Sequence, residues 1–266
     1  MQPFALVRPE TVGEAVRILA GEEDAELLAG GQTLIPTMKQ GLRRPAVLVS
    51  LARCRELVGI REQDGEIVIG AMTPHADVAR SSLTRRILPG LAELAGLIGD
   101  PAVRSRGTIG GSIANADPAA DYPAALLALE ADIVTDRRHI PAGEFFRGLF
   151  ETALEAGEIV TAVRFPAARR SAYAKFRHPA SGYAVVGVFV AELANGEARV
   201  AVTGAAPTAF RWQEAEARLA GANWQPAALD DLSLDPAGLN SDPHADASYR
   251  AHLAAVMLRR TVETFA

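Results

Sequence analysis

Cysteine is almost absent from this sequence, since Cys54 is the only one among 266 residues. A lone cysteine excludes an internal disulfide. It also excludes a cysteine metal site or an iron–sulfur cluster held by this chain alone, because such sites take about four ligands. The histidines show no metal-ligand spacing; they are His75, His139, His178, His244 and His252. We therefore predict no resident metal, mostly surface or capping histidines, and a buried Cys54 in a reducing compartment.

Long apolar runs and concentrated positive charge are also missing. No stretch of about eighteen residues stays apolar, so the sequence predicts no membrane-spanning helix. The net charge is −5 and the arginine pairs are scattered, so no basic stripe indicates a nucleic-acid partner. The first ten residues have the pattern of a strand rather than of a secretion signal, and we predict a cytoplasmic protein.

Two common enzyme motifs are absent as well. The sequence has no Gly-x-Gly-x-x-Gly run with an acidic residue about twenty positions on, which argues against a doubly wound dinucleotide-binding domain. It has no Gly-x-Ser-x-Gly motif, which argues against the hydrolases that use that nucleophile turn. We predict no residue of this chain in a catalytic role of its own.

Two glycine pairs, in contrast, are present: Gly30-Gly31 within residues 29–34 and Gly110-Gly111 within residues 108–112. Glycine lacks a Cβ, so its backbone can approach a ligand closely and point consecutive N–H groups at phosphate oxygens. The hydroxyl residues that follow, Thr33 and Ser112, can add hydrogen bonds or cap the next helix. Either pair alone is also typical of a plain turn, but two of similar design favour a diphosphate held from two sides.

Hydrophobic patterning and turn residues predict an α+β protein in three parts. Residues 1–56 alternate strands (4–7, 26–29, 46–51) with helices (one opening at Thr11, one over 33–40), which predicts a small α/β unit. Residues 57–170 begin with a hairpin through Asp64-Gly65 and continue with helices over 83–98 and 118–131 and strands over 132–135 and 159–165. This second part is predicted to be an α+β unit.

The third part, residues 171–266, is predicted to be a three-stranded antiparallel sheet with helices. Its strands are expected over 173–178, 183–192 and 197–204, and Asn195-Gly196 has the pattern of a hairpin turn between the last two. Helices are expected over 209–220 and 249–265.

Three segments carry a resemblance to a known family. They are Ile98-Gly99-Asp100-Pro101-Ala102-Val103-Arg104, Thr108-Ile109-Gly110-Gly111-Ser112-Ile113-Ala114-Asn115-Ala116-Asp117-Pro118 and Asp121-Tyr122-Pro123. In order and spacing they resemble the FAD-binding medium subunit of molybdenum hydroxylases, of the carbon monoxide dehydrogenase medium chain type, related to the flavin domain of xanthine dehydrogenase. The likeness runs over essentially the whole chain. It implies a two-part FAD-binding domain followed by a C-terminal domain of three antiparallel strands and helices, which matches the three parts above.

The resemblance also implies FAD contacts. It places the diphosphate against Ala29, Gly30, Gly31, Gln32, Thr33 and Leu34, and against Thr108, Ile109, Gly110, Gly111 and Ser112. It places Asp121 at the ribose or adenine end with Ile159 against the adenine, and it places Ile98, Tyr183 and Lys175 around the isoalloxazine. Judged from the residues alone, Asp121 as a helix-start acid, Tyr183 as a core aromatic and Lys175 as a solvated strand residue remain alternatives.

Three positions depart from the residues that are common in the family: Gln32, Ser112 and Gly182. None of these departures removes a backbone donor. We therefore expect them to alter flavin potential or acceptor access rather than flavin binding.

The activity that the resemblance implies is electron transfer. FAD in this chain would take electrons from [2Fe-2S] clusters of an iron–sulfur small subunit and pass them to an external acceptor. The molybdenum pterin would lie in a large subunit, in a dimer of heterotrimers that oxidises carbon monoxide, an aldehyde or a heterocycle. Two alternatives stay open: a self-contained FAD-dependent reductase of the same fold, and a nucleotide-binding module without a redox role.

Overall fold

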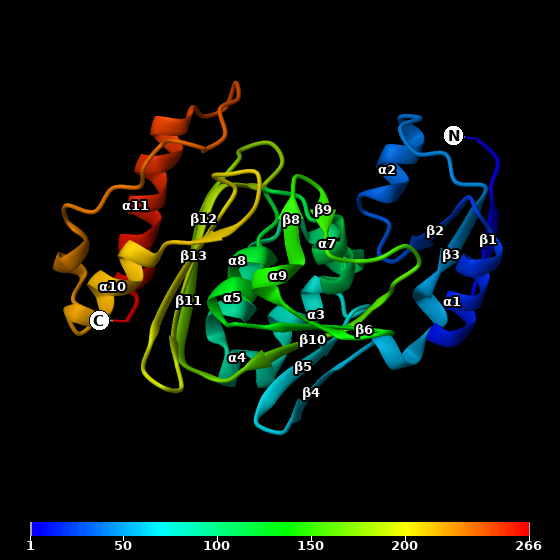
Figure 1. Ribbon diagram of the computed structural model, residues 1–266, viewed down its shortest axis with the longest axis horizontal. Helices are drawn as coiled ribbons and strands as arrows, with labels where there is room; N and C mark the ends of the chain where they lie inside the picture. Colours follow the sequence, from blue (N-terminus) through cyan, green and yellow to red (C-terminus); the bar gives the residue numbers. More distant parts are fainter. Residues whose placement is uncertain (1, 266) are drawn as a thin grey trace.

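Three units follow one another along the longest axis of the molecule (Figure 1). The computed structural model describes residues 2–265. The N-terminal unit, in blue, lies at one end, and the C-terminal unit, in yellow to red, lies at the other. A middle unit of helices and a sheet separates them, so any ligand that touches all three units has to be bound around this middle unit.

The N-terminal unit is a three-stranded parallel sheet in the order β1-β3-β2. Its elements are β1 (Ala5–Val7), α1 (Val12–Gly21), β2 (Ala25–Leu28), α2 (Leu34–Lys39), β3 (Val47–Ser50) and the short 3-10 helices η1 (Leu51–Arg53) and η2 (Arg55–Leu57). Thr11 caps α1, because its hydroxyl accepts the Glu14 N–H at 3.2 Å. The predicted small α/β unit is confirmed.

The middle unit is built on a five-stranded sheet in the order β4-β5-β10-β6-β7, with every pairing antiparallel. Its strands are β4 (Ile60–Gln63), β5 (Glu66–Gly70), β6 (Asp132–Thr135), β7 (His139–Pro141) and β10 (Val160–Pro166), and β8 (Phe146–Gly148) and β9 (Glu151–Thr152) form a separate hairpin. Asp64 and Gly65 form the predicted turn with φ of 55° and 79°, a conformation typical of two-residue hairpins.

Helices of the middle unit cover this sheet, and two of them also pack on the sheet of the C-terminal unit. The helices of the middle unit are α3 (His75–Arg80), α4 (Ser82–Ile87), α5 (Pro89–Leu97), α6 (Pro101–Arg106), α7 (Ile109–Asn115), α8 (Tyr122–Ala128) and α9 (Ala142–Phe145). The predicted helix over 118–131 is therefore too long. The Gly204 N–H donates to the Pro118 carbonyl at 2.9 Å and the Thr203 hydroxyl to the Ala120 carbonyl at 2.6 Å, so the start of that segment is a turn bound to the C-terminal sheet.

The C-terminal unit has four antiparallel strands, in the order β11-β12-β13-β14, rather than the three that were predicted. Its elements are β11 (Ala168–Arg177), β12 (Ala184–Leu193), β13 (Ala198–Thr203), β14 (Phe210–Arg211), α10 (Gln213–Gly221), η3 (Pro226–Leu229) and α11 (Ala247–Glu263). The two residues of β14 pair with β13 where a helix was expected from 209. Strand β11 begins ahead of the predicted boundary at 170, and the boundaries themselves stay predictions.

The central sheet of the C-terminal unit is buried on both faces (Figure 1). On one face, Tyr173 and Phe189 join the core of the middle unit. On the other face, Val188 and Val190 pack with α11 side chains such as Leu258. Burial on both faces explains why β12 is apolar along nearly its whole length. The contact fixes β11 and β12 against α5 and α8.

Candidate functional site

The two glycine segments begin in different structural contexts. The first glycine loop, residues 29–34, connects β2 to α2 and lies partly at the surface. The second glycine loop, residues 108–112, opens helix α7, and Thr108, Ile109 and Gly110 are buried. One loop therefore belongs to the N-terminal unit and the other to the middle unit.

These two loops lie against each other, although about eighty residues separate them in the sequence. A Cβ added to Gly30 would collide with the backbone of Arg106 and would lie 2.8 Å from the Gly107 Cα. A Cβ added to Gly111 would lie 3.4 Å from the Ala29 Cβ. Glycine at these positions lets the two backbones approach closely. The two loops that the sequence singled out are therefore neighbours in the structure.

The first glycine loop has backbone donors to offer. Within residues 2–265, no N–H from Gly30 to Leu34 donates a hydrogen bond to another protein group. Gly31 has a φ of +72°, the left-handed conformation that glycine adopts without strain. Thr33 is the N-cap residue of α2, but its side chain makes no capping hydrogen bond. Five consecutive N–H groups and one hydroxyl are thus available to an anion at a partly exposed position.

The second glycine loop, in contrast, uses most of its donors internally. Ile109 donates to Thr73 at 3.2 Å, Gly110 to Ala71 at 2.9 Å, and Ser112 to the Thr108 carbonyl at 3.0 Å. The Gly111 N–H is bound by the Thr108 hydroxyl at 3.1 Å, which caps α7. The expectation that both loops present free consecutive N–H groups is therefore wrong for this loop, because the protein has already satisfied them.

Gly110 is a packing glycine. A Cβ there would lie 2.5 Å from the Ala71 Cβ and 2.8 Å from the Ala71 carbonyl oxygen. Real side chains do not approach a backbone this closely, so α7 can lie against the end of β5 only because this residue has no side chain. Ser112 lies within α7 rather than at its cap.

His75 is an exception to the expectation of mostly surface or capping histidines. Its side chain is buried at the start of α3, and its N–H donates to the Gly107 carbonyl at 2.9 Å. Burial, with a smaller contribution from the Arg104 charge, lowers the pKa of His75 to about 4, so the ring is neutral near pH 7. Its Nδ1 has no hydrogen-bond partner among residues 2–265. No periodicity or spacing in the sequence predicts that His75 is buried.

A buried ionic cluster lies where the middle and C-terminal units meet. The Lys175 ammonium of β11 lies 2.9 Å from Asp121 Oδ1 and 3.1 Å from Oδ2. The Tyr173 hydroxyl donates to Asp121 Oδ1 at 2.6 Å. The side chains of Asp121 and Lys175 are only 4% and 1% exposed. Lys175 is therefore not a solvated strand residue, and Asp121 is not an ordinary helix-start acid.

The electrostatics of this cluster follow from its burial. Loss of solvent raises the pKa of Asp121, while the Lys175 charge and the Tyr173 hydroxyl act in the opposite direction. Burial and the Asp121 charge raise the pKa of Tyr173 well above its ordinary value, so this hydroxyl stays protonated and donates. The ammonium has three N–H groups and no acceptor but Asp121 within residues 2–265, which leaves at least one donor for a ligand.

Ile98 and Tyr183 come from two segments that touch beside this cluster. A Cβ added to Gly99 would lie 3.0 Å from both the Gly182 Cα and the Ser181 carbonyl. Tyr183 is 48% exposed, so it is not a core aromatic. Burial and the charges of Asp117 and Asp121 raise its pKa.

Two of the expected FAD contacts change in the light of these positions. Asp121 and Lys175 are in direct contact, so they cannot lie at opposite ends of an extended cofactor, and their two assignments cannot both be right. Ile159 precedes β10 and is 1% exposed, packed in the core of the N-terminal unit with Val49 and Leu57. Its side chain is covered by protein, and its contact with adenine stays a prediction.

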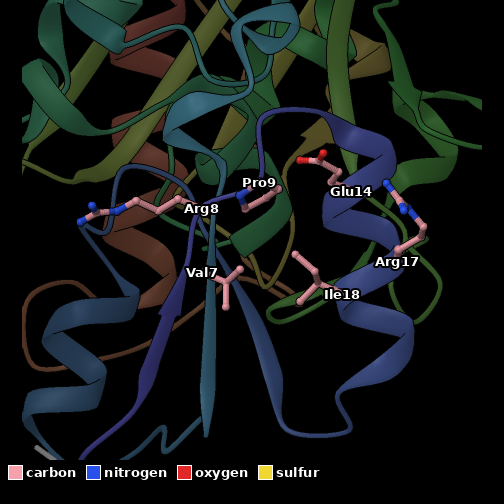
Figure 2. A pocket seen from close by; sticks show the side chains of 6 residues that line it. All are labelled: Val7, Arg8, Pro9, Glu14, Arg17 and Ile18. Carbon is pink, nitrogen blue, oxygen red and sulfur yellow. The ribbon is translucent and has the colours of Figure 1, made fainter.

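Two hollows of the surface lie elsewhere. Figure 2 shows one of about 420 Å³ beside β1 and α1, lined by Val7, Arg8, Pro9, Glu14, Arg17 and Ile18. A second, of about 250 Å³, is lined by Glu23, Asp24, Ala25, Glu26, Arg44 and Pro45. Neither includes a residue of the glycine loops or of the Asp121 cluster, so neither of these two hollows marks the candidate site.

The donor set fits a dinucleotide with a redox ring. Unpaired N–H groups in the first glycine loop suit a diphosphate, whereas the buried ammonium of Lys175 and the half-exposed ring of Tyr183 suit a planar group that gains negative charge. No group of three or more His, Cys, Asp and Glu side chains gathers as metal ligands within residues 2–265. In the same residues, no helix is long and apolar enough to cross a membrane.

This fold and donor set define an FAD-binding protein of two lobes with an additional C-terminal sheet. The family described as the FAD binding domain in molybdopterin dehydrogenase matches residues 2–168. The family described as the CO dehydrogenase flavoprotein C-terminal domain matches residues 171–265. The chain therefore belongs to the family of FAD-binding domains of molybdopterin dehydrogenases. Within it the chain is of the medium-subunit type of the molybdenum hydroxylases, which are oxidoreductases.

Similar proteins span nearly the whole chain. The carbon monoxide dehydrogenase medium chain of Hydrogenophaga pseudoflava is 39% identical, over 97% of this chain and 96% of the relative. The 6-hydroxypseudooxynicotine dehydrogenase complex subunit alpha of Paenarthrobacter nicotinovorans is 36% identical, over 97% and 93%. A solved structure of carbon monoxide dehydrogenase from Hydrogenophaga pseudoflava superimposes with a TM-score of 0.89 at 40% identity, over 99% of this chain and 98% of that chain. The predicted family, fold class and cofactor are confirmed.

Proposed function

We propose that this chain binds FAD and carries electrons from the [2Fe-2S] clusters of a partner subunit to an external acceptor. The observation that supports it most is the row of free N–H groups in the first glycine loop, adjacent to a second loop that is already satisfied. Bound FAD supplies the ability to accept and release electrons singly or in pairs. Everything else in the site serves to hold and tune it.

In this proposal each residue has a physical task. Ala29 to Leu34 bind the diphosphate through backbone N–H groups, and Thr33 adds its hydroxyl. The second glycine loop, Thr108 to Ser112, supports the first by close packing and caps α7. Ile98 and Tyr183 exclude water from the ring, and Lys175 keeps a positive charge close to it. We assign Asp121 to this ring end, where it holds Lys175, rather than to the adenine end.

The partners follow from what this chain cannot hold. One buried cysteine cannot ligate an iron–sulfur cluster, so the clusters belong to a small subunit. The molybdenum pterin belongs to a large subunit, and we propose a dimer of heterotrimers. Relatives described as a medium chain and as a complex subunit support a multi-subunit assembly. A cytoplasmic location stays a prediction of the sequence.

Substrate choice is expected to lie outside this chain. The two relatives above are named for carbon monoxide and for a nicotine derivative, yet each resembles this chain over nearly its full length. A subunit that only carries electrons need not differ between such substrates. The acceptor, in contrast, must approach the ring side of this chain, where Tyr183 is exposed.

The experiment that tests this function is an absorption spectrum of the purified chain, with mass spectrometry of the ligand released on denaturation. We expect one FAD per chain, reduced by electrons from the co-expressed small subunit and not by a nicotinamide alone. Reduction by a nicotinamide and turnover of a small substrate without partners would instead indicate the self-contained reductase. A colourless nucleotide would indicate the module without a redox role.

A further inference from the structure

We propose that Tyr173 is a positioning residue that holds the Asp121 carboxylate against Lys175, and thereby fixes the place of the ammonium at the ring end of the FAD site. This inference rests on the function proposed above, because it concerns how the chain tunes that cofactor. The residue was not singled out in the sequence, where it is an ordinary strand tyrosine. Three observations carry it: its hydrogen bond, its burial and the space made for it.

The hydrogen bond is directed at the carboxylate oxygen that Lys175 approaches most closely. Tyr173 Oη lies 2.6 Å from Asp121 Oδ1, and Lys175 Nζ lies 2.9 Å from the same oxygen. The tyrosine ring is 2% exposed, so water does not compete for the carboxylate on that side. A donor to a buried carboxylate stabilises its ionised form over its protonated form.

The neighbouring strand is shaped to admit this hydroxyl. A Cβ added to Gly187 of β12 would collide with Tyr173 Oη and would lie 3.0 Å from the Thr203 side chain. Gly187 pairs with Lys175 across the strands, so the absence of its side chain leaves room for Tyr173 next to the ion pair. Any larger residue would displace the hydroxyl from Asp121.

The position of the Lys175 ammonium depends on this arrangement. Tyr173 and Lys175 are the two groups that hold the Asp121 carboxylate, and both contact Asp121 Oδ1. Removing the Tyr173 hydroxyl takes away one of them, so the carboxylate and the ammonium bound to it would lose their fixed position. Lys175 would then lie less closely at the ring end and would favour a ring that carries negative charge less strongly.

Other titratable groups face the same cluster and have to be considered. Asp117 and Tyr183 approach it from the loop before α8 and from the start of β12, and burial raises the pKa of each. Glu93 of α5 faces the backbone of Tyr173, and burial raises its pKa as well. None of them is in the hydrogen bond that links Tyr173 to Asp121, so a variant without that hydroxyl isolates the link.

The test is the reduction potential of bound FAD in Tyr173→Phe, measured with the full chain across pH. We expect a more negative potential, equivalent to an approximately tenfold loss in preference for reduced over oxidised FAD. The matched control is Tyr122→Phe, which removes a buried hydroxyl that has no partner within residues 2–265 and is expected to leave the potential unchanged.

A double-mutant cycle separates positioning from general packing. If Tyr173 acts through Asp121, then Tyr173→Phe should shift the potential in the wild-type background and not in an Asp121→Asn background. Equal shifts in both backgrounds, or a potential in Tyr173→Phe equal to that of the wild type, would overturn the inference and leave FAD binding intact. A wild-type chain that takes up no FAD would overturn the proposed function itself, which is a different result.

Discussion

The two glycine loops look alike in sequence but serve different purposes in the structure. The first glycine loop leaves its N–H groups without protein acceptors from Gly30 to Leu34, within residues 2–265. The second glycine loop has given most of its donors to Ala71, Thr73 and Thr108. A glycine pair therefore does not by itself mark an anion site. The decisive property is whether the N–H groups are satisfied before a ligand arrives.

The largest effect expected from this difference follows Gly110→Ala. The new Cβ would lie 2.5 Å from the Ala71 Cβ, so we expect a loss of about 3 kcal/mol in the free energy of unfolding, from overpacking. Urea denaturation of the chain without FAD measures it. The matched control is Gly13→Ala in α1, where a Cβ meets no atom within 4 Å and helix propensity favours alanine. Equal stability of both variants would contradict a packing role for the second loop.

A smaller effect is expected from pH, through His75 beside the second glycine loop. Its folded pKa of about 4 lies below the ordinary value of 6.5, so the unfolded chain binds more protons between these values. The contribution of neutral His75 to the free energy of unfolding is therefore complete above pH 6.5 and is lost as the pH falls toward 4. It amounts to about 2 kcal/mol of unfolding free energy between pH 7.5 and pH 5.

Denaturant midpoints across this pH range test the histidine prediction. His75→Gln should have a flatter dependence than the wild type, because its side chain does not titrate. His252→Gln is the control, since His252 is exposed on α11 and its loss should leave the slope unchanged. If the stability of His75→Gln depends on pH as steeply as that of the wild type, another group causes the dependence.

The smallest effects are expected from a pair of threonine substitutions. Thr108→Val removes the cap of α7 and should cost about 1 kcal/mol of unfolding free energy, with little direct effect on FAD affinity. Thr33→Val removes a hydroxyl without a capping hydrogen bond, so stability should hold while FAD affinity falls about fivefold. Urea denaturation and FAD fluorescence titration measure the two quantities. A loss of stability in Thr33→Val together with a loss of FAD affinity in Thr108→Val would contradict the roles given to the two loops.

Local features of the fold could be predicted from the sequence, because a few adjacent residues determine them. The turn at Asp64-Gly65 and the cap at Thr11 are of this kind. The short α8 and the fourth strand could not, because they depend on contacts between distant segments. The Thr203 hydroxyl bound to the Ala120 carbonyl, for example, joins residues that are 83 positions apart.

The candidate site also has features that the sequence predicted and features that depend on contacts between distant segments. The resemblance carried by the glycine segments predicted the cofactor and singled out both loops, and the structure shows that the two loops lie against each other. The sequence could not reveal that Asp121 binds Lys175, 54 residues away, or that Tyr173 completes the cluster. Nor could it reveal which loop keeps free donors, because that depends on the carbonyls of Ala71 and Thr73, which come from other segments.

The central claim is that the first glycine loop binds the FAD diphosphate while the second is a structural support. Amide hydrogen exchange, resolved by residue and measured with and without FAD, tests it most directly. We predict slow exchange from Ile109 to Ser112 in both states, and fast exchange from Gly30 to Leu34 that becomes slow when FAD binds. Fast exchange in the second loop that only FAD slows, with no change in the first loop, would contradict the account.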